Sequence, residues 1–322
     1  MHPLETGNDI SKAKQWLEAG ELVAIPTETV YGLAANGLNA EAVLKIYKAK
    51  NRPQFNPLIL HVAYLSEAKK LVQYFPEKAM LLAKHFWPGP LTLVLPKKDI
   101  VPDIVSAGHN TVAIRVPNHP LTLQLLRQLN FPLAAPSANP SGYISPTSAQ
   151  HVLQQLGNKV KYVLDGGDCA VGVESTIVKV TEDEVTILRY GGLSVEDIEA
   201  LVGTVQHSNS NNQNPEAPGM MLSHYAPSAP LIIGDIAAEI KKHAGKKIAV
   251  LSFSTLYHLP EPSVCIILSE KRNLDEAARN IFSCLRKIDA LNPDVILSEF
   301  VPDEGLGKAI NDRLKRAAVA KN

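Results

Sequence analysis

The sequence predicts an α/β protein with two domains, the first on a mixed sheet and the second on a smaller βαβ-type sheet. Apolar runs of four to six residues alternate with segments of helical periodicity along most of the chain. The length of 322 residues favours two domains over one. Residues 205–219, rich in Asn, Ser and Pro, interrupt the alternation and are typical of a linker with almost nothing that could enter a core.

The first domain begins with a predicted helix over residues 8–19, which starts near Asn8 or Asp9 and ends before Gly20. A short apolar run over 21–25 follows it. The later predicted strands cover 57–62, 91–95, 111–116, 132–135, 162–164, 175–180 and 185–188. The later predicted helices cover 40–50, 77–85, 121–129, 147–156 and 195–201.

The sheet of the first domain is predicted to be mixed, because the strands on either side of Glu182-Asp183-Glu184 read as a hairpin. In the second domain, predicted strands at 231–233, 247–251, 264–268 and 295–297 alternate with helices at 236–243, 274–291 and 306–318. We therefore expect a first domain over 1–204, a linker over 205–230 and a second domain over 231–322.

The composition is that of an ordinary globular protein, with 45% hydrophobic and 20% charged residues. Residues 1–205 hold 18 basic and 19 acidic residues, and the rest of the chain holds 14 and 13. Neither half is basic, which argues against a protein that mainly binds phosphate backbones, such as a double-stranded RNA binding module.

The three cysteines, Cys169, Cys265 and Cys284, form no C-x-x-C pair. Their spacing excludes a cysteine zinc ribbon and indicates free thiols in a reducing compartment. The first residues do not read as a signal peptide, and no apolar stretch approaches the about 18–20 residues of a membrane span. We expect a soluble, cytoplasmic protein.

The densest cluster of unusual residues lies between residues 25 and 62. A polar turn, Pro26-Thr27-Glu28-Thr29, leads into a helical stretch that closes on Lys50 and Arg52, and His61 lies inside the next apolar run. Ligands of open α/β sheets bind at the ends of such runs, so the cluster is a candidate site. A helix N-cap turn with solvated helix charges is the alternative for any one of these residues.

Two later motifs carry similar chemistry. Ser137 and Asn139 follow an apolar run and offer hydroxyl and amide groups to phosphate or carboxylate oxygens, although turn chemistry alone also explains them. Arg115 lies inside an apolar strand, where a guanidinium is costly to bury unless it meets an anion. That anion is either a ligand or a Glu or Asp of the protein, and the sequence leaves both open.

Other familiar site motifs are missing from the sequence. The Gly166 to Gly172 loop opens into a strand rather than a helix, and Gly305-Leu306-Gly307-Lys308 has neither the glycine spacing nor the hydroxyl of a phosphate-binding loop. Zinc-hydrolase histidine pairs and the G-x-S-x-G elbow do not occur. Tyr225, an aromatic residue in the linker, suggests docking onto a ligand or onto the other domain.

In combination, the motifs resemble those of the YrdC-type threonylcarbamoyl-AMP synthases in their two-domain long form. The resemblance covers essentially the whole chain and rests on P-T-E-T-V-Y-G-L, K-x-R, S-x-N, S-P-T, E-S-T-I, H-Y-A-P and G-L-G-K-A-I-N-D-R-L. It implies a twisted mixed sheet with a concave, electropositive cavity, followed by a Rossmann-like domain.

The resemblance also implies a nucleotidyl transfer in which L-threonine, bicarbonate or CO2, and ATP give threonylcarbamoyl-AMP and pyrophosphate. That product serves N6-threonylcarbamoyladenosine modification of tRNA next to the anticodon, so tRNA would be an indirect partner, reached through a transferase complex. Mg²⁺ is expected with the ATP, with no protein ligand assigned. A carbamoyl-transfer enzyme of hydrogenase maturation can share the first domain, but the cysteine count excludes its zinc-finger segments.

The site residues implied by the resemblance form three groups. Those expected to be catalytic are Lys50 and Arg52. Those expected to bind ATP are Arg52, Asn56, Thr111, Ser137, Ser145, Arg189 and Tyr225. Those expected to bind L-threonine are Thr29, His61, Arg115, the backbone of Ala135, and Ser175. Residues 220–227 are expected to form a lid over the cavity of the first domain.

Overall fold

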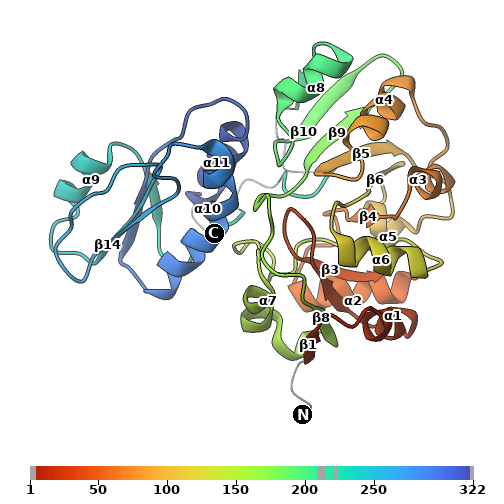
Figure 1. Cartoon of the computed structure of the whole chain (residues 1–322), viewed down its shortest axis with the longest axis horizontal. Helices are drawn as coiled ribbons and strands as arrows, with labels where there is room; N and C mark the ends of the chain where they lie inside the picture. Colours follow the sequence, from red (N-terminus) through yellow and green to blue (C-terminus); the bar gives the residue numbers. More distant parts are fainter. Residues whose placement is uncertain (1–4, 209–214, 221–223, 320–322) are drawn as a thin grey trace.

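The computed structural model describes residues 5–208, 215–220 and 224–319, which form two α/β domains on separate sheets (Figure 1). The strands of the first domain are β1 (Glu5–Gly7), β2 (Val23–Ile25), β3 (Gly32–Asn36), β4 (Ile59–His61), β5 (Leu91–Pro96), β6 (Thr111–Arg115), β7 (Leu133–Ala134), β8 (Tyr162–Leu164), β9 (Thr176–Val180), β10 (Val185–Arg189) and β11 (Gln206–His207). Its helices are α1 (Ile10–Glu18), α2 (Ala40–Lys50), α3 (Leu65–Leu71), α4 (Glu77–Phe86), α5 (Asp103–Ser106), α6 (Pro120–Gln128), α7 (Ala149–Leu156) and α8 (Val195–Val202).

The first sheet is mixed, as the sequence predicts. Its strands run in the order β1-β8-β2-β3-β7-β4-β6-β5-β9-β10-β11. β9 and β10 pair antiparallel across the predicted hairpin, whereas β4 pairs parallel to β6 and β5 parallel to β9. The mixed order brings the ends of β4 and β6, and the turns after β2 and β7, to one region of the sheet, where the candidate site lies.

The second sheet is parallel throughout and has the order β12-β15-β13-β14. Its elements are β12 (Leu231–Ile233), α9 (Ile236–Lys242), β13 (Ile248–Ser252), β14 (Val264–Ile267), α10 (Leu274–Ala290), β15 (Val295–Ser298) and α11 (Gly307–Ala317). In Figure 1, α10 and α11 lie on the side facing the first domain, and α9 lies on the far side.

Every helix and strand predicted from the sequence is present within about two residues of its predicted bounds, but several elements were not predicted. The most consequential is β3, because the sequence predicts a helical stretch directly after the polar turn. Its run Gly-Leu-Ala-Ala-Asn has no strand periodicity, and pairing with β2 and β7 decides its conformation. Gly32 allows close packing there, since a Cβ at this position would lie 3.2 Å from that of Ala135.

The predicted linker also differs from expectation. Gln206 and His207 form β11 on the edge of the first sheet, and Val205 is buried. Ala217 and Met220 are buried too, in an apolar cluster with residues of β4, β5, β6, β9 and β10. Although residues 205–219 hold almost nothing that could enter a core, Val205 and Ala217 do so, because small apolar side chains can pack once a sheet face lies beside them. The domain limits at 204 and 231 stay predictions.

No helix in the described part of the chain is both long and apolar enough to cross a lipid bilayer.

Docking of residues 215–220 on the first sheet can be tested at Ala217, which has no exposed surface. We expect Ala217→Asp to release the segment, because burying an unpaired carboxylate costs about 3 kcal/mol or more. Limited proteolysis would detect new cleavage within 215–220. The matched change Ala200→Asp, on the exposed side of α8, should leave the cleavage pattern of the wild type. An unaltered pattern in Ala217→Asp would show that docking does not depend on this contact.

Candidate active site

A cavity of about 50 Å³ lies where the turns after β2 and β7 meet β4, β6 and the end of β10. Nine of the thirteen residues predicted for the site line it: Thr29, Arg52, His61, Arg115, Ala135, Ser137, Ser175, Arg189 and Tyr225. Lys50, Asn56, Thr111 and Ser145 are not among the lining residues. The sheet thus gathers residues from eight segments that the sequence scatters over about two hundred positions.

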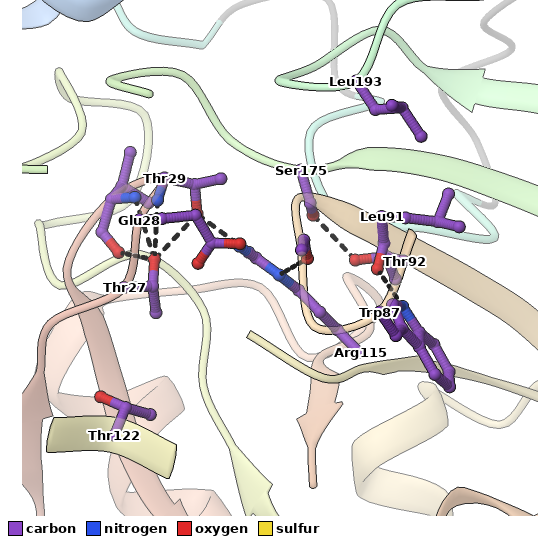
Figure 2. Close-up of polar contacts among 12 residues, drawn as sticks. Thr27, Glu28, Thr29, Trp87, Leu91, Thr92, Arg115, Thr122, Ser175 and Leu193 are labelled. Atoms are coloured by element: carbon purple, nitrogen blue, oxygen red, sulfur yellow. Dashed lines mark hydrogen bonds and ion pairs between the residues drawn. The ribbon is translucent and has the colours of Figure 1, made fainter. Parts of the chain in front are cut away.

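The polar turn after β2 is fixed by the hydroxyl of Thr27. This hydroxyl donates to the carbonyl of Val30 at 2.6 Å and accepts from the amides of Thr29 and Val30 at 3.2 and 3.1 Å. Such side-chain bonds hold a turn in one conformation. Figure 2 shows the result, with Glu28 and Thr29 both directed at Arg115. Thr27 therefore sets the direction of two neighbouring side chains.

Arg115 pairs with an acidic residue of the protein, one of the two alternatives that the sequence left open, and it also lines the cavity. Its Nε donates to the carbonyl of Gly89 at 3.1 Å, and its Nη1 donates to the hydroxyl of Thr29 at 2.9 Å. Its Nη2 lies 2.7 Å from a carboxylate oxygen of Glu28 (Figure 2). A guanidinium has five N–H donors, so donors remain for a ligand carboxylate.

His61 is held as a neutral imidazole. The pKa of His61 is lowered to about 3. Burial is the main cause and the nearby charge of Arg115 adds to it, whereas the backbone groups of Ile59 and Leu133 oppose the shift. Its Nδ1 is buried and has no hydrogen-bond partner among the described residues. A neutral imidazole has one donor and one acceptor nitrogen, so Nδ1 can donate to or accept from a ligand according to the tautomer.

Arg189 ties Ser175 to the segment that follows residue 214. Its Nε and Nη2 donate to the carbonyl of Ser175 at 3.1 and 2.9 Å, and Nη2 also reaches the Ser175 hydroxyl at 3.1 Å. Its Nη1 donates to the carbonyl of Pro218 at 3.1 Å. Burial lowers the pKa of Arg189 to about 10, so the group remains charged near neutral pH. Ser175 in turn shares a 2.8 Å hydrogen bond with Thr92 (Figure 2).

Arg52 lines the cavity and is supported by the chain just after it. Its Nη2 donates to the side-chain oxygen of Asn56 at 2.6 Å and to the carbonyl of Pro57 at 2.8 Å. Its Nε donates to the Asn56 carbonyl at 3.2 Å. In this structure Asn56 therefore positions Arg52 instead of lining the cavity itself.

Lys50 acts in the structure as a support for the S-x-N loop. Its ammonium is buried and donates to the carbonyl of Ser137 at 2.5 Å and to the carbonyl of Asn139. Burial lowers the pKa of Lys50 well below its ordinary value, and the charge of Arg52 adds to the effect. The loop that presents Ser137 to the cavity is thus fastened to the end of α2.

The other two predicted residues outside the lining have different surroundings. The hydroxyl of Ser145, which is fully buried, donates to Oε1 of Glu174 at 2.5 Å. Ser145 therefore orients a residue that does line the cavity. Thr111 is the first residue of β6, paired with Pro96 on β5, and it is half-buried. Neither residue reaches the cavity here.

Among the lining residues that sequence reasoning did not assign, the titratable ones are Glu174 and His224. Burial raises the pKa of Glu174, but Arg313, Arg189 and the Ser145 hydroxyl outweigh it and lower the pKa to about 2. Burial lowers the pKa of His224 to about 3, although Glu174 opposes the shift. Both residues belong to motifs that the sequence displays, E-S-T-I and H-Y-A-P, so adjacency to a predicted residue was the available signal.

The second domain reaches the wall of the site through Arg313 on α11. Its Nε donates to Glu174 at 2.9 Å, and its Nη2 donates to the carbonyl of Tyr190 at 2.9 Å. The guanidinium also lies over the ring of Tyr225, 5.0 Å from the ring centre. Arg313 is fully buried, so the contact between the domains is part of the packed interior.

Tyr225 lies between the cavity and the second domain. It lines the cavity, and its ring stacks on Phe282 of α10 with 5.3 Å between ring centres. Its φ of 64° is a left-handed conformation that strains a residue with a side chain. The cavity, at about 50 Å³, is small beside the roughly 300 Å³ of small ligand sites, and residues 221–223 of the lid expected over 220–227 lie outside the described residues.

The charges around the cavity favour an anionic ligand. Three buried arginines line the cavity, Arg52, Arg115 and Arg189, and the buried carboxylates of this region are Glu28 and Glu174. Arg313, behind the cavity wall, pairs with both Glu174 and Asp312, so the guanidinium groups of the lining carry the positive charge of the cavity. Within the described ranges no three His, Cys, Asp or Glu side chains are grouped as metal ligands. Both oxygens of Glu174 are already engaged, so this carboxylate is not free to hold a metal ion.

Comparisons with known proteins agree with this geometry. A family model described as "Telomere recombination" matches residues 15–191, and one described as "Threonylcarbamoyl-AMP synthase, C-terminal domain" matches residues 193–319. A threonylcarbamoyl-AMP synthase of Pyrococcus abyssi is 43% identical, covering 95% of this chain and 93% of the relative. One of Bacillus subtilis is 42% identical, covering 96% and 92%. A crystal structure of P. abyssi Sua5 complexed with L-threonine superposes with a TM-score of 0.92, at 41% identity, covering 98% of this chain and 97% of the other.

The neutral state of His61 predicts a pH dependence of stability. The unfolded chain binds a proton at this histidine below a pKa of about 6.5, whereas the folded protein does not until about pH 3. The contribution of His61 to the free energy of unfolding is therefore fully present above about pH 6.5 and is lost as the pH falls below that value. We expect His61 to account for about 2 kcal/mol of the loss between pH 7.5 and pH 5. Urea unfolding of wild type and His61→Asn at both pH values measures it, and equal losses in the two proteins would contradict it.

Proposed function

The chain belongs to the Sua5/YciO/YrdC family, and we propose from this membership and the site that it is a threonylcarbamoyl-AMP synthase. The observation that carries the proposal is one cavity in which Arg115 and His61 lie together with Arg52 and Arg189. An amino acid has a carboxylate for a guanidinium and polar groups for a neutral imidazole. A nucleotide has phosphates for the remaining arginines.

We assign the L-threonine end to Thr29, His61, Arg115, the backbone of Ala135, and Ser175. The binding of L-threonine by the P. abyssi relative supports this assignment. We assign the ATP end to Arg52, Ser137, Arg189 and Tyr225. Lys50, Asn56 and Ser145 support these residues from behind, through the contacts described above.

The reaction needs no covalent bond to the enzyme. The amine of threonine and CO2, supplied as bicarbonate, form a carbamate whose oxygen attacks the α-phosphorus of ATP. One P–O bond forms as the P–O bond to the leaving pyrophosphate breaks. Such a step requires positioning, charge stabilisation and exclusion of water. The buried guanidinium groups that line the cavity supply the charge. A segment that closed over the cavity would exclude water from a carbamate that water decomposes.

Mg²⁺ would accompany the ATP and neutralise part of its phosphate charge when bound. Glu174 is committed to Ser145 and Arg313, and Glu28 is paired with Arg115. The protein side chains therefore fit an ion held mainly by phosphate oxygens and water. The product would pass to tRNA modification through another enzyme, since neither half of this chain has the basic surplus of an RNA-binding protein.

The proposal is tested by mixing the purified protein with ATP, L-threonine and bicarbonate and measuring pyrophosphate release. We expect release only when all three substrates are present, together with a product of the mass of threonylcarbamoyl-AMP. Pyrophosphate release that is unchanged without threonine would overturn the assignment.

The assignment of Arg52 to ATP and of Arg115 to threonine predicts a division of labour. We expect Arg52→Ala to raise the KM for ATP and Arg115→Ala to raise the KM for threonine, each by about ten- to a hundredfold, because a charged hydrogen-bond partner is worth about 1.5–3 kcal/mol. Steady-state kinetics with each substrate varied measures both values. Arg127→Ala, at an exposed position of α6, should change neither KM. Equal effects of Arg52→Ala and Arg115→Ala on both substrates would contradict the division.

Closure of the site predicts a distinct defect for Tyr225. We expect Tyr225→Ala to weaken ATP binding about tenfold and to speed loss of the labile adenylate, because the segment no longer seals the cavity. The same change should lower the melting temperature, since the ring packs on Phe282. Tyr225→Phe retains the ring and should preserve melting. Isothermal titration and a product-decay assay measure these effects. A Tyr225→Ala protein that is less stable but retains the adenylate normally would show that Tyr225 contributes only to packing.

A further inference from the structure

Glu28 is a buried carboxylate in the described part of the site, and the proposed reaction assigns it no role. Its side chain is only 8% exposed, and one oxygen lies 2.7 Å from Nη2 of Arg115. Yet in the described part of the chain neither Glu28 oxygen accepts a hydrogen bond, and Nη2 of Arg115 donates none. The two groups are close but not aligned, so the contact is an attraction of charges without a hydrogen bond.

The position of Glu28 is fixed by its backbone. The turn is held by the Thr27 hydroxyl, and the carbonyl of Glu28 accepts from the amide of Val171 at 2.7 Å. Arg115 and Thr29 line the cavity, whereas Glu28 does not. Glu28 therefore cannot touch a ligand in this arrangement. Its negative charge nevertheless lies directly behind the guanidinium that the ligand would meet.

The charge of Glu28 shifts the pKa of other groups nearby. Burial raises the pKa of Cys169, and the charge of Glu28 raises it further. Burial lowers the pKa of His119, and Glu28 is among the groups that oppose the shift. In a buried, weakly screened region such a charge extends over several ångströms. A ligand bound at Arg115 lies within that reach.

A buried carboxylate without hydrogen bonds is costly to desolvate, and a Gln of the same shape would not remove that cost, because it would leave the buried charge of Arg115 without its partner. The carboxylate of Glu28 compensates the positive charge of Arg115, so the pair carries no net charge. An uncompensated buried guanidinium would attract any small anion. A compensated one favours a ligand that brings a positive group beside its carboxylate.

We propose that Glu28 is a specificity-determining residue, which makes the Arg115 end of the cavity select a zwitterionic amino acid over a simple anion of the same shape. The inference rests on the proposed function and deepens it by naming how the amino-acid end distinguishes its substrate. The ligand carboxylate meets Arg115, and the ligand ammonium lies in the negative potential of Glu28. A purely structural ion pair is the competing explanation.

Binding calorimetry on the full-length protein at pH 7.5 separates the two explanations. The ligands are L-threonine and the dihydroxybutanoate of the same configuration, in which a hydroxyl replaces the amine. We expect the wild type to bind threonine at least about tenfold more tightly than the hydroxy acid. Glu28→Gln should reduce this ratio by about tenfold, chiefly by tighter binding of the hydroxy acid. Glu28→Asp, which retains the charge, should keep the ratio within about threefold of the wild type.

Glu77→Gln is the control, because it removes a carboxylate that is exposed at the start of α4, away from the cavity lining. Its ratio of threonine to hydroxy acid should equal that of the wild type. An unchanged ratio in a folded Glu28→Gln protein would overturn the proposal and leave a structural ion pair. If circular dichroism shows that Glu28→Gln is unfolded, the wild-type ratio carries the test, and equal binding of both ligands overturns the proposal. A wild type that binds neither ligand would refute the threonine assignment itself, whereas tight threonine binding with an unchanged ratio refutes only the role of Glu28.

Discussion

Charged groups that cannot lose their charge must be given acceptors when they are buried, and this constraint organises the site. Arg115 obtains its acceptors from the turn after β2 and the loop before β5, and Arg189 obtains them from Ser175 and Pro218. Each set of acceptors joins segments that are distant in the sequence. The bonds that make the arginines tolerable inside the protein are therefore the same bonds that assemble the cavity.

The same constraint explains why the second domain belongs to the site. Glu174 is buried at the cavity wall, and its second oxygen is satisfied by Arg313 of α11. Arg313 also covers the ring of Tyr225, which stacks on Phe282. The closing segment thus lies between two domains, and the apolar cluster around it includes residues of both. A movement of Tyr225 away from the cavity would therefore also change the contacts between the two domains.

Several residues singled out by the motifs serve other residues instead of the cavity. Lys50 holds the S-x-N loop, Asn56 holds Arg52, and Ser145 holds Glu174. A motif marks residues that act together, but it does not separate those that contact a ligand from those that orient them. That separation depends on which atoms face the cavity, and the order of residues along a chain does not contain it.

The sequence by itself determined the fold class, because hydrophobic periodicity and turn residues are local signals that survive in the tertiary structure. It also singled out Arg115, since an arginine in an apolar strand requires an anion wherever the strand lies. Only the tertiary structure decided that Glu28 is one such anion and that Arg313 meets Glu174 from 139 positions away. It alone decided that β3 is a strand and that Ala217 is buried. These outcomes depend on contacts between segments far apart in the chain, which cancel or override weak local preferences.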